Sequence, residues 1–313
     1  SRTLLFNIHE LAWDPELARL LEAPRLVLPE VHACAHEFGS SEFDGIFPAP
    51  VPITAMIGDS HSAFFGERCF AAGAAKATLG TGSSILLNAG ATAPPPYPST
   101  MSTIGFALPD RVDYALEGII VSAGAVLTWM QRELGLYEKS AGLEALEAGL
   151  EDAGGVSVIP GHAGLGAPFW RMDARGSIHG LTFGTSKAHI VRAALESIPY
   201  QIRAILDAVR EESGTECRSI RADGGISRNG FVTRWIADTL GVPVHTFSVA
   251  DVTALGAAFL AGIASGVYSG IDAVAAVELG ETIRRPGDAR EAAETGYARW
   301  RQTVDLNWRT NAR

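Results

Sequence analysis

The sequence RADGGISRNG at residues 221–230 decides the fold class more than any other stretch of this chain. It follows an amphipathic helical pattern and a short apolar run, so it predicts a strand, a tight glycine turn and the start of a helix. Glycines let a backbone adopt positive φ and approach a bulky ligand. A helix that begins there offers N–H groups and a positive dipole end to an anion. Turns without ligands use the same residues, so this stretch alone leaves both interpretations open.

A second turn of the same character lies far away in the sequence. LGTGSS at residues 79–84 stands between two apolar runs that predict a hairpin-like pair of strands at Ala75–Leu79 and Ser84–Asn88. Two separate turns rich in Gly and Thr in one chain indicate a nucleotide held between them.

Strand and helix patterns alternate along the remaining chain, which is typical of an α/β fold. Further strands are predicted at Thr3–Asn7, Ile53–Ile57, Thr103–Leu108, Val112–Glu117, Val156–Ile159, Arg218–Ala222 and Val244–Phe247. Helices are predicted at Pro15–Leu21, Ser62–Phe70, Ser122–Leu134, Leu143–Leu150, His189–Glu212, Phe231–Leu240 and Ala254–Gly266. The charged remainder is expected to be helical.

Composition excludes several classes of function. The chain has 313 residues and is 47% hydrophobic, which is enough for one large domain or two ordinary ones with ample core. Its net charge of −10 argues against a nucleic-acid partner, because binding that backbone needs clustered Lys and Arg. No apolar run reaches the roughly 18 residues that span a bilayer, so no membrane association is expected. Three scattered cysteines without metal-ligand spacing indicate reduced thiols of a cytoplasmic protein.

Several motifs, in the right order, resemble the FGGY carbohydrate kinases. GSIHGL at residues 176–181, followed by HI at 189–190 and AALE at 193–196, matches a sequence pattern of that family. The stretches that are similar to its glycerol kinases are GLGAPFW at 164–170, SRTLLFNIH at 1–9, WDP at 13–15, LPEV at 28–31, YALEG at 114–118 and TALGAA at 253–258. The likeness runs from Ser1 to about Tyr268.

The resemblance implies an actin-like ATPase (ribonuclease H-like) fold, in which a mixed sheet is flanked by helices and ATP lies between two domains. It implies that residues 1–66 are the tail of the N-terminal kinase domain and that residues 67–313 form the C-terminal domain with the nucleotide-binding loops. Because Ser1 opens the chain without an initiator Met, we expect it to be cut from a longer protein. The missing N-terminal half would carry the first phosphate loop and much of the acceptor pocket.

Phosphoryl transfer needs a carboxylate that accepts the proton of the attacking hydroxyl. The resemblance places this catalytic base at Asp59, in GDSH at residues 58–61. The residues alone favour another role, in which Asp59 caps a helix that begins at Ser60. His61 is either a substrate contact or a structural residue on the helix face.

The resemblance assigns a second set of residues to the nucleotide: Gly80, Thr81, Gly82, Gly124, Thr128, Gly225 and Asn229. The first three match a phosphate loop, in which a hydroxyl and backbone N–H groups bind phosphate oxygens. Thr128 stands where glycerol kinases have glutamine, which puts its nucleotide contact in question. Asn229 can border the adenine, cap a helix, or do both.

The expected substrate-binding residues are Asp59, Ser60 and Ser84, and two of them depart from the glycerol kinases. Ser60 replaces a glutamine, and Ser84 replaces a phenylalanine that lies against the glycerol carbons. Losing an aromatic wall and gaining a hydroxyl makes the pocket roomier and more polar. Such a pocket suits a tetritol, a pentulose or another polyol as well as glycerol.

The sequence therefore predicts an ATP-dependent kinase that phosphorylates a hydroxyl of a small polyol or sugar. Mg²⁺ is expected to accompany ATP, no metal site is expected in the protein itself, and a homo-oligomer is compatible with the sequence. The isolated chain is expected to be inactive, because the first domain closes over the substrate in this family. One alternative is a non-catalytic nucleotide-binding fragment or regulator. Another is an actin- or chaperone-type ATPase, which shares the fold but not the motifs within residues 164–196.

Overall fold

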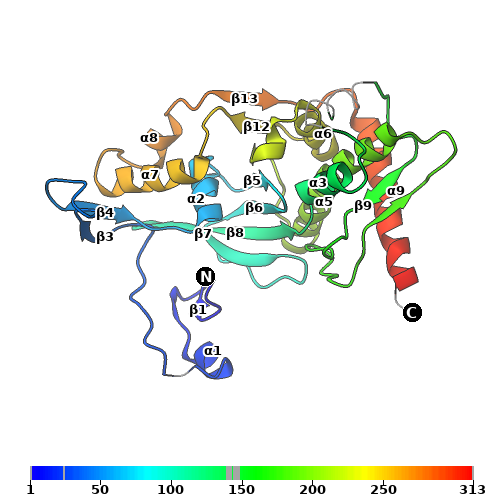
Figure 1. The fold of residues 1–313 in the computed structure, drawn as a ribbon. Helices are drawn as coiled ribbons and strands as arrows, with labels where there is room; N and C mark the ends of the chain where they lie inside the picture. Colours follow the sequence, from blue (N-terminus) through cyan, green and yellow to red (C-terminus); the bar gives the residue numbers. More distant parts are fainter. Residues whose placement is uncertain (1, 24, 139–142, 144–148, 312–313) are drawn as a thin grey trace.

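The computed structural model describes residues 2–23, 25–138, 143 and 149–311. Its centre is a seven-stranded sheet (Figure 1), formed by β5 (Ala74–Leu79), β6 (Ser83–Gly90), β7 (Met101–Leu108), β8 (Arg111–Ile120), β11 (Ser219–Asp223), β12 (Val244–Phe247) and β13 (Glu281–Arg284). The strand order is β13-β12-β11-β5-β6-β8-β7. The β11 strand pairs in parallel with β5 and β12, and the other neighbours are antiparallel. The sheet is therefore mixed, as expected.

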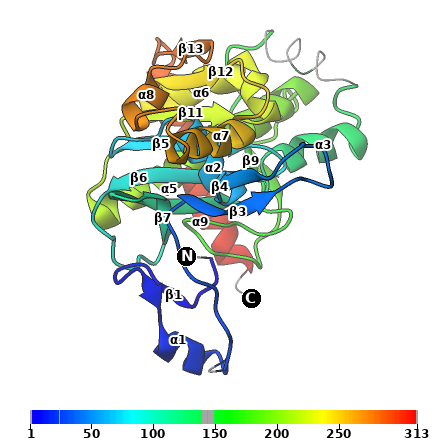
Figure 2. The ribbon, with the colours of Figure 1, turned by 90° about the vertical axis from the view of Figure 1, so that its left-hand side faces the viewer.

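Helices cover both faces of the sheet, and each face has its own core. The first face carries α3 (Gly124–Arg132), α5 (Lys187–Ser213), α6 (Gly230–Leu240) and α9 (Arg290–Asn311). The second carries α2 (Asp59–Gly66), α7 (Val252–Ala264) and α8 (Ile271–Ala275). Figure 2 shows α2 and α7 in front of the sheet and α5 and α9 behind it. The alternation of strand side chains explains this division, since Ile85 and Leu87 enter the first core while Leu86 enters the second.

The α5 helix is the long amphipathic helix predicted from the sequence. Ile198, Ile202 and Ile205 follow the helical period and are at most 1% exposed. The helix ends at Gly214, which adopts the left-handed conformation with φ of 72°. Its length and burial make it the main support for the sheet on this face.

Glycines let α2 and α7 touch along their backbones. A Cβ atom on Gly256 would lie 1.9 Å from the Ser62 carbonyl oxygen, and one on Gly66 would lie 2.4 Å from the Val252 carbonyl oxygen. No larger residue fits at either point without separating the helices. This contact fixes the start of α2, where Asp59 is the first helical residue.

Smaller elements surround the main sheet. They are the antiparallel pairs β1 (Phe6–Asn7) with β2 (Ala12–Trp13), β3 (Ala35–Ser41) with β4 (Val51–Ala55), and β9 (Ser157–Ile159) with β10 (Ser177–His179), together with α1 (Pro15–Leu20). The segment with β1 and α1 lies apart from the sheet (Figure 1). A hydrogen bond from the Tyr114 hydroxyl to the Ile8 carbonyl, 2.9 Å long, connects it to β8.

Most predicted strands and helices are confirmed, and the differences fall at element ends, at one turn and in a few strands. The short strands β2 and β10 were missed, and α2 ends at Gly66 rather than Phe70. The α2 helix begins at Asp59 rather than Ser62, because Gly58 takes the extended N-cap conformation. The glycine turn leads into a short 3₁₀ helix, η1 (Gly225–Arg228), before α6 begins. The strand β3 was missed, because AHEFGSS contains Gly and Ser, which have low strand propensity. The expected all-helical remainder contains the edge strand β13, whose largely exposed residues give no apolar alternation. Apart from residues 143, 149 and 150, the helix predicted at Leu143–Leu150 lies outside the described residues.

Candidate functional site

Two glycine turns meet at the carboxyl ends of the neighbouring parallel strands β5 and β11. Gly224 has φ of +85°, and a Cβ atom there would lie 2.5 Å from the Leu79 carbonyl oxygen. Only glycine fits this approach, because the conformation and the contact both exclude a side chain. The two turns that predicted a nucleotide site from the sequence are therefore in direct backbone contact.

The start of α3 joins the same junction. The Gly80 carbonyl accepts a hydrogen bond from the N–H of Gly124 at 3.0 Å, and the Thr81 carbonyl accepts from Ala123 and Ala125 at 2.9 and 3.0 Å. The hairpin turn thus satisfies the first N–H groups of α3, which are not left for an anion. The exposed Thr81 hydroxyl makes no hydrogen bond within the part of the chain that the structure describes, so it is free to donate to a ligand.

A cavity of about 660 Å³ lies at this junction, and it gathers the predicted nucleotide residues. Gly80, Thr81, Gly124, Thr128, Gly225 and Asn229 all line it, together with apolar side chains that include Leu127 and Tyr137. The predicted residue Gly82 does not line this cavity and lies instead on the neighbouring one. A Cβ atom on Gly225 would meet nothing within 4 Å, so the backbone there is open to a ligand.

Two polar side chains of this cavity also have structural roles. The Asn229 side chain caps α6, since its Oδ1 accepts the Val232 N–H at 3.0 Å. The helix-cap interpretation of Asn229 is therefore correct, and its position on the cavity wall keeps the nucleotide contact open as well. The Thr128 hydroxyl donates to the Gly124 carbonyl within α3 at 3.2 Å.

A second cavity, of about 570 Å³, holds the predicted substrate residues Asp59, Ser60 and Ser84. The hairpin turn lies between the two cavities: Gly80 and Thr81 face the first, and Gly82 faces the second. Asp59 is exposed, and one of its carboxylate oxygens accepts the Ser60 N–H at 2.6 Å. It stands in the first turn of α2 but is not its N-cap, which is Gly58. Its carboxylate can therefore accept a proton from a hydroxyl bound in this cavity.

A chain of polar side chains forms the floor of this second cavity. The Lys76 ammonium donates to Ser60 Oγ at 3.0 Å, the Ser60 and Ser84 hydroxyls are 3.1 Å apart, and Ser84 Oγ donates to Glu117 Oε1 at 3.2 Å. Arg2 forms an ion pair with the other oxygen of Glu117. Lys76 and Glu117 are only 1% and 2% exposed.

Strand register explains how this chain of residues assembles. Lys76, Leu86 and Glu117 are cross-strand partners on β5, β6 and β8, and Ser84 lies two residues from Leu86 on the same face. Our sequence reasoning missed Lys76 and Glu117. The signal was a charged residue inside each apolar strand pattern, since buried charges are rare unless they are paired.

His61, by contrast, is a structural residue. It is 9% exposed, its Nε2 lies 3.4 Å from the Thr103 hydroxyl, and it does not line the second cavity. Burial, followed by the nearby charges of Arg2 and Lys76, lowers the pKa of His61 to about 4. It is therefore neutral at physiological pH.

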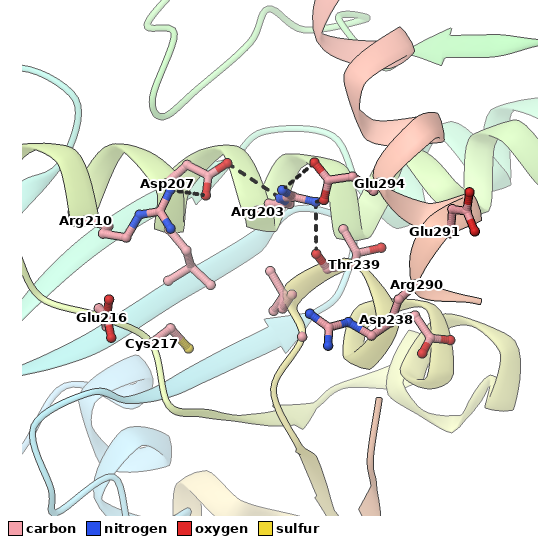
Figure 3. Close-up of a pocket in the computed structure, with 13 residues that line it drawn as sticks. Arg203, Asp207, Arg210, Glu216, Cys217, Asp238, Thr239, Arg290, Glu291 and Glu294 are labelled. Atoms are coloured by element: carbon pink, nitrogen blue, oxygen red, sulfur yellow. Dashed lines mark hydrogen bonds and ion pairs between the residues drawn. The ribbon is translucent and has the colours of Figure 1, made fainter. Parts of the chain in front are cut away.

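A third cavity, of about 670 Å³, lies between α5, α6 and α9 and contains none of the predicted residues (Figure 3). Several of its charged side chains form ion pairs with one another. Arg203 donates to both carboxylate oxygens of Glu294 at 2.6 and 3.0 Å and to the Thr239 carbonyl at 3.2 Å. Asp207 pairs with Arg203 at 3.6 Å and with Arg210 at 3.7 Å. This arrangement stabilises the packing of the three helices.

Two classes of site are absent from the part of the chain that the structure describes. No three His, Cys, Asp or Glu side chains there are grouped so that they could hold a metal ion. No helix there has the length and apolar character needed to cross a membrane.

Comparison with known proteins identifies the family. Residues 75–265 match the FGGY family of carbohydrate kinases, C-terminal domain. This chain belongs to that family. It is 43% identical to a glycerol kinase from Symbiobacterium thermophilum over 308 residues, and 41% identical to one from Xanthomonas campestris over 305 residues. Each alignment covers 97% of this chain but only 61% of the relative, so the chain spans about three fifths of these proteins.

Solved structures of FGGY kinases show the same fold. The glycerol kinase of Plasmodium falciparum, solved with ADP, superposes with a TM-score of 0.89 at 31% identity, covering 97% of this chain and 61% of that one. A ligand-bound xylulose kinase from Lactobacillus acidophilus gives a TM-score of 0.85 at 20% identity, covering 96% and 62%. The predicted actin-like ATPase fold is therefore confirmed. The predicted boundary between residues 66 and 67 stays a prediction.

Proposed function

We propose that this chain provides the nucleotide site and the catalytic base of an ATP-dependent kinase that phosphorylates a hydroxyl of a small polyol or sugar. The observation that carries the proposal is the pair of cavities on the two sides of the Gly80–Ser84 turn. One cavity is lined by the two glycine turns and has the free Thr81 hydroxyl. The other has the carboxylate of Asp59. A kinase needs this combination, because it must hold phosphates beside a hydroxyl whose proton is removed.

Each residue then has a defined task. ATP supplies the transferred phosphoryl group and Mg²⁺ accompanies it, with no protein side chain assigned to the metal. Asp59 accepts the proton of the attacking hydroxyl, while Ser60 and Ser84 orient the acceptor. Thr81 donates hydrogen bonds to phosphate oxygens, and the glycines at positions 80, 82, 124 and 225 keep the backbone open to the nucleotide. Asn229 and Thr128 border the same nucleotide.

The proposal also includes a further domain and a cellular location. Exposed apolar side chains are frequent in the first 56 residues, including Leu4, Leu20, Val27, Ile46 and Met56. Exposed apolar side chains in such number are a feature of surfaces that another domain covers. It supports a kinase whose N-terminal domain packs here and completes the acceptor pocket, as the greater length of the relatives also suggests. The three free cysteines support a cytoplasmic location.

The test is ATP consumption by the longest protein that the gene for this sequence encodes. Glycerol, erythritol, the pentitols and the corresponding ketoses serve as acceptors with Mg-ATP, and the phosphate ester is identified by ³¹P NMR. We expect acceptor-dependent ADP release and a phosphomonoester product with at least one of these compounds. ADP binding without turnover on any acceptor would contradict the proposal and favour the alternative of a non-catalytic nucleotide-binding regulator.

A further inference from the structure

The two serines in the acceptor cavity belong to a hydrogen-bond chain whose direction is fixed at both ends. An ammonium group can only donate, and Lys76 donates to Ser60 Oγ at 3.0 Å. An ionised carboxylate can only accept, and Glu117, paired with Arg2, accepts from Ser84 Oγ at 3.2 Å. The Ser60–Ser84 contact of 3.1 Å lies between these two ends.

Counting protons settles the middle contact. A serine hydroxyl has one proton and two lone pairs. Ser84 gives its proton to Glu117, so Ser60 must donate to Ser84. Ser60 then donates its proton to Ser84 and accepts from Lys76 through one lone pair. Ser84 donates its proton to Glu117 and accepts from Ser60 through one lone pair. Each serine retains one lone pair and no proton for a ligand.

Lys76 shares its buried surroundings with two acidic groups. Glu67 and Asp223 both act electrostatically with it, and Glu67 is completely buried with neither carboxyl oxygen hydrogen-bonded in the part of the chain that the structure describes. Burial raises the pKa of Glu67 well above its ordinary value, followed by repulsion from Asp223. Burial also raises the pKa of Asp223. Because burial favours the protonated forms of both carboxyl groups, the donor end of the chain rests on the Lys76–Ser60 contact itself, in which an ammonium has only protons to offer.

We propose that Ser60 and Ser84 present only hydrogen-bond acceptors, and that the pocket therefore selects an alcohol over a ketone at the carbon beside the phosphorylated hydroxyl. An alcohol brings its own proton to the free lone pairs. A ketone oxygen would face two oxygen lone pairs without a donor, which leaves polar groups unpaired in the complex. The inference rests on the proposed kinase function. It separates polyols from ketoses, whereas the sequence left both open.

The probes are two pairs of compounds, glycerol with dihydroxyacetone and erythritol with erythrulose. Because one end of erythrulose has an alcohol beside its terminal hydroxyl, ³¹P NMR locates the product, and only transfer to the hydroxyl beside the ketone is counted. The measurement is the ratio of kcat/KM for alcohol over ketone in the longest product of the gene. We expect a ratio of at least about tenfold in both pairs. A ketone that matches or exceeds its alcohol in both pairs would overturn the inference while leaving the kinase function intact. If no compound in either pair, and no other polyol or sugar, is phosphorylated, both proposals fail.

Glu117→Gln tests the direction of the chain with almost no change in shape. Arg2 retains the amide oxygen, so the amide NH₂ faces Ser84 and donates to it. Ser84 then has a proton for the ligand, and the alcohol-to-ketone ratio should fall by about tenfold or more. Ser84→Ala, which frees the proton of Ser60, should lower the ratio in the same direction if the first variant does not fold. Glu133→Gln, the same change at the exposed end of α3, is the control and should keep the wild-type ratio. An unchanged ratio in both folded site variants would overturn the inference.

Discussion

Asp59 and His61 lie in the same turn of α2 but meet different surroundings. Asp59 is exposed on the second cavity, whereas His61 points into the packed layer between α2 and β7. Sequence alone assigned Asp59 to catalysis through its family resemblance and left two roles open for His61. The difference is set by burial, which a single sequence does not contain.

His61 gives a pH-dependent prediction. Its pKa is lowered to about 4 in the folded protein from an ordinary value of 6.5, so the unfolded chain takes up the proton first on acidification. The stabilising effect of neutral His61 is complete above pH 6.5 and is lost as the pH falls towards 4. A shift of this size corresponds to about 3 kcal/mol of unfolding free energy.

Urea unfolding at pH 7 and pH 4.5 checks this for the wild type and for His61→Gln. The variant should lose less unfolding free energy between the two pH values, by about 2–3 kcal/mol, because its amide does not titrate. Equal losses in the two proteins would show that other groups account for the acid sensitivity.

The sequence could not predict the Lys76–Ser60–Ser84–Glu117 chain for a related reason. Ser60 lies on α2, and Lys76, Ser84 and Glu117 lie on β5, β6 and β8. Strand register places the last three on one face of the sheet, and the packing of α2 on that face brings Ser60 to them. The serines were predicted because they stand at family positions. The ammonium and the carboxylate that orient them were not, because cross-strand neighbours follow from pairing rather than from local sequence.

At the scale of elements, the proposed nucleotide cavity depends on two glycine turns. The positions of these turns follow from local sequence and were predicted. The DGG and GTG turns follow β11 and β5, and their glycines meet as the parallel strands bring them together. The 3₁₀ helix after Gly224 and the edge strand β13 were not predicted. The first is a fine detail of the turn, and the second is an exposed strand without an apolar pattern.

Adjacent glycines in the DGG turn provide a matched pair of variants. Gly224→Ala places a methyl group 2.5 Å from the Leu79 carbonyl oxygen at φ of +85°, so it should lower the unfolding free energy by at least about 1–3 kcal/mol. Gly225→Ala meets open space and should leave the unfolding free energy unchanged or slightly higher.

Calorimetric measurement of ADP affinity in the same two variants distinguishes a loss of stability from a loss of nucleotide binding. The Gly225→Ala methyl group enters the nucleotide cavity, so ADP affinity should fall although the fold is intact. A Gly224→Ala protein as stable as the wild type would contradict the backbone contact. Full ADP affinity in Gly225→Ala would place the nucleotide away from this turn.

At the scale of the whole molecule, both cavities open on the surface of this chain. Asp59 and Thr81 are exposed, so the chain by itself does not exclude water from the space between them. Phosphoryl transfer in water loses much of its electrostatic stabilisation and competes with hydrolysis. The open cavities are therefore compatible with binding of the two proposed ligands, whereas turnover would need a site closed to water.

We accordingly expect the 313-residue chain alone to bind ADP but to turn over at least 100-fold more slowly than a kinase with its N-terminal domain. Coupled ADP-release assays on the purified chain, with and without that domain supplied, check the expectation. Turnover by the chain alone at the roughly 1–100 per second of ordinary kinases would show that these 313 residues suffice.

The most direct test of the account is Asp59→Asn in the longest product of the gene, with kcat, ADP affinity and unfolding free energy measured on one preparation. The amide keeps an oxygen that accepts the Ser60 N–H, but it cannot take a proton from the acceptor hydroxyl. We predict that kcat falls by about 10²–10⁴-fold, while the Kd for ADP stays within about twofold and the unfolding free energy within about 0.5 kcal/mol. Turnover near the wild-type value together with a clear loss of stability would make Asp59 a structural residue of α2 and contradict its assignment as the base.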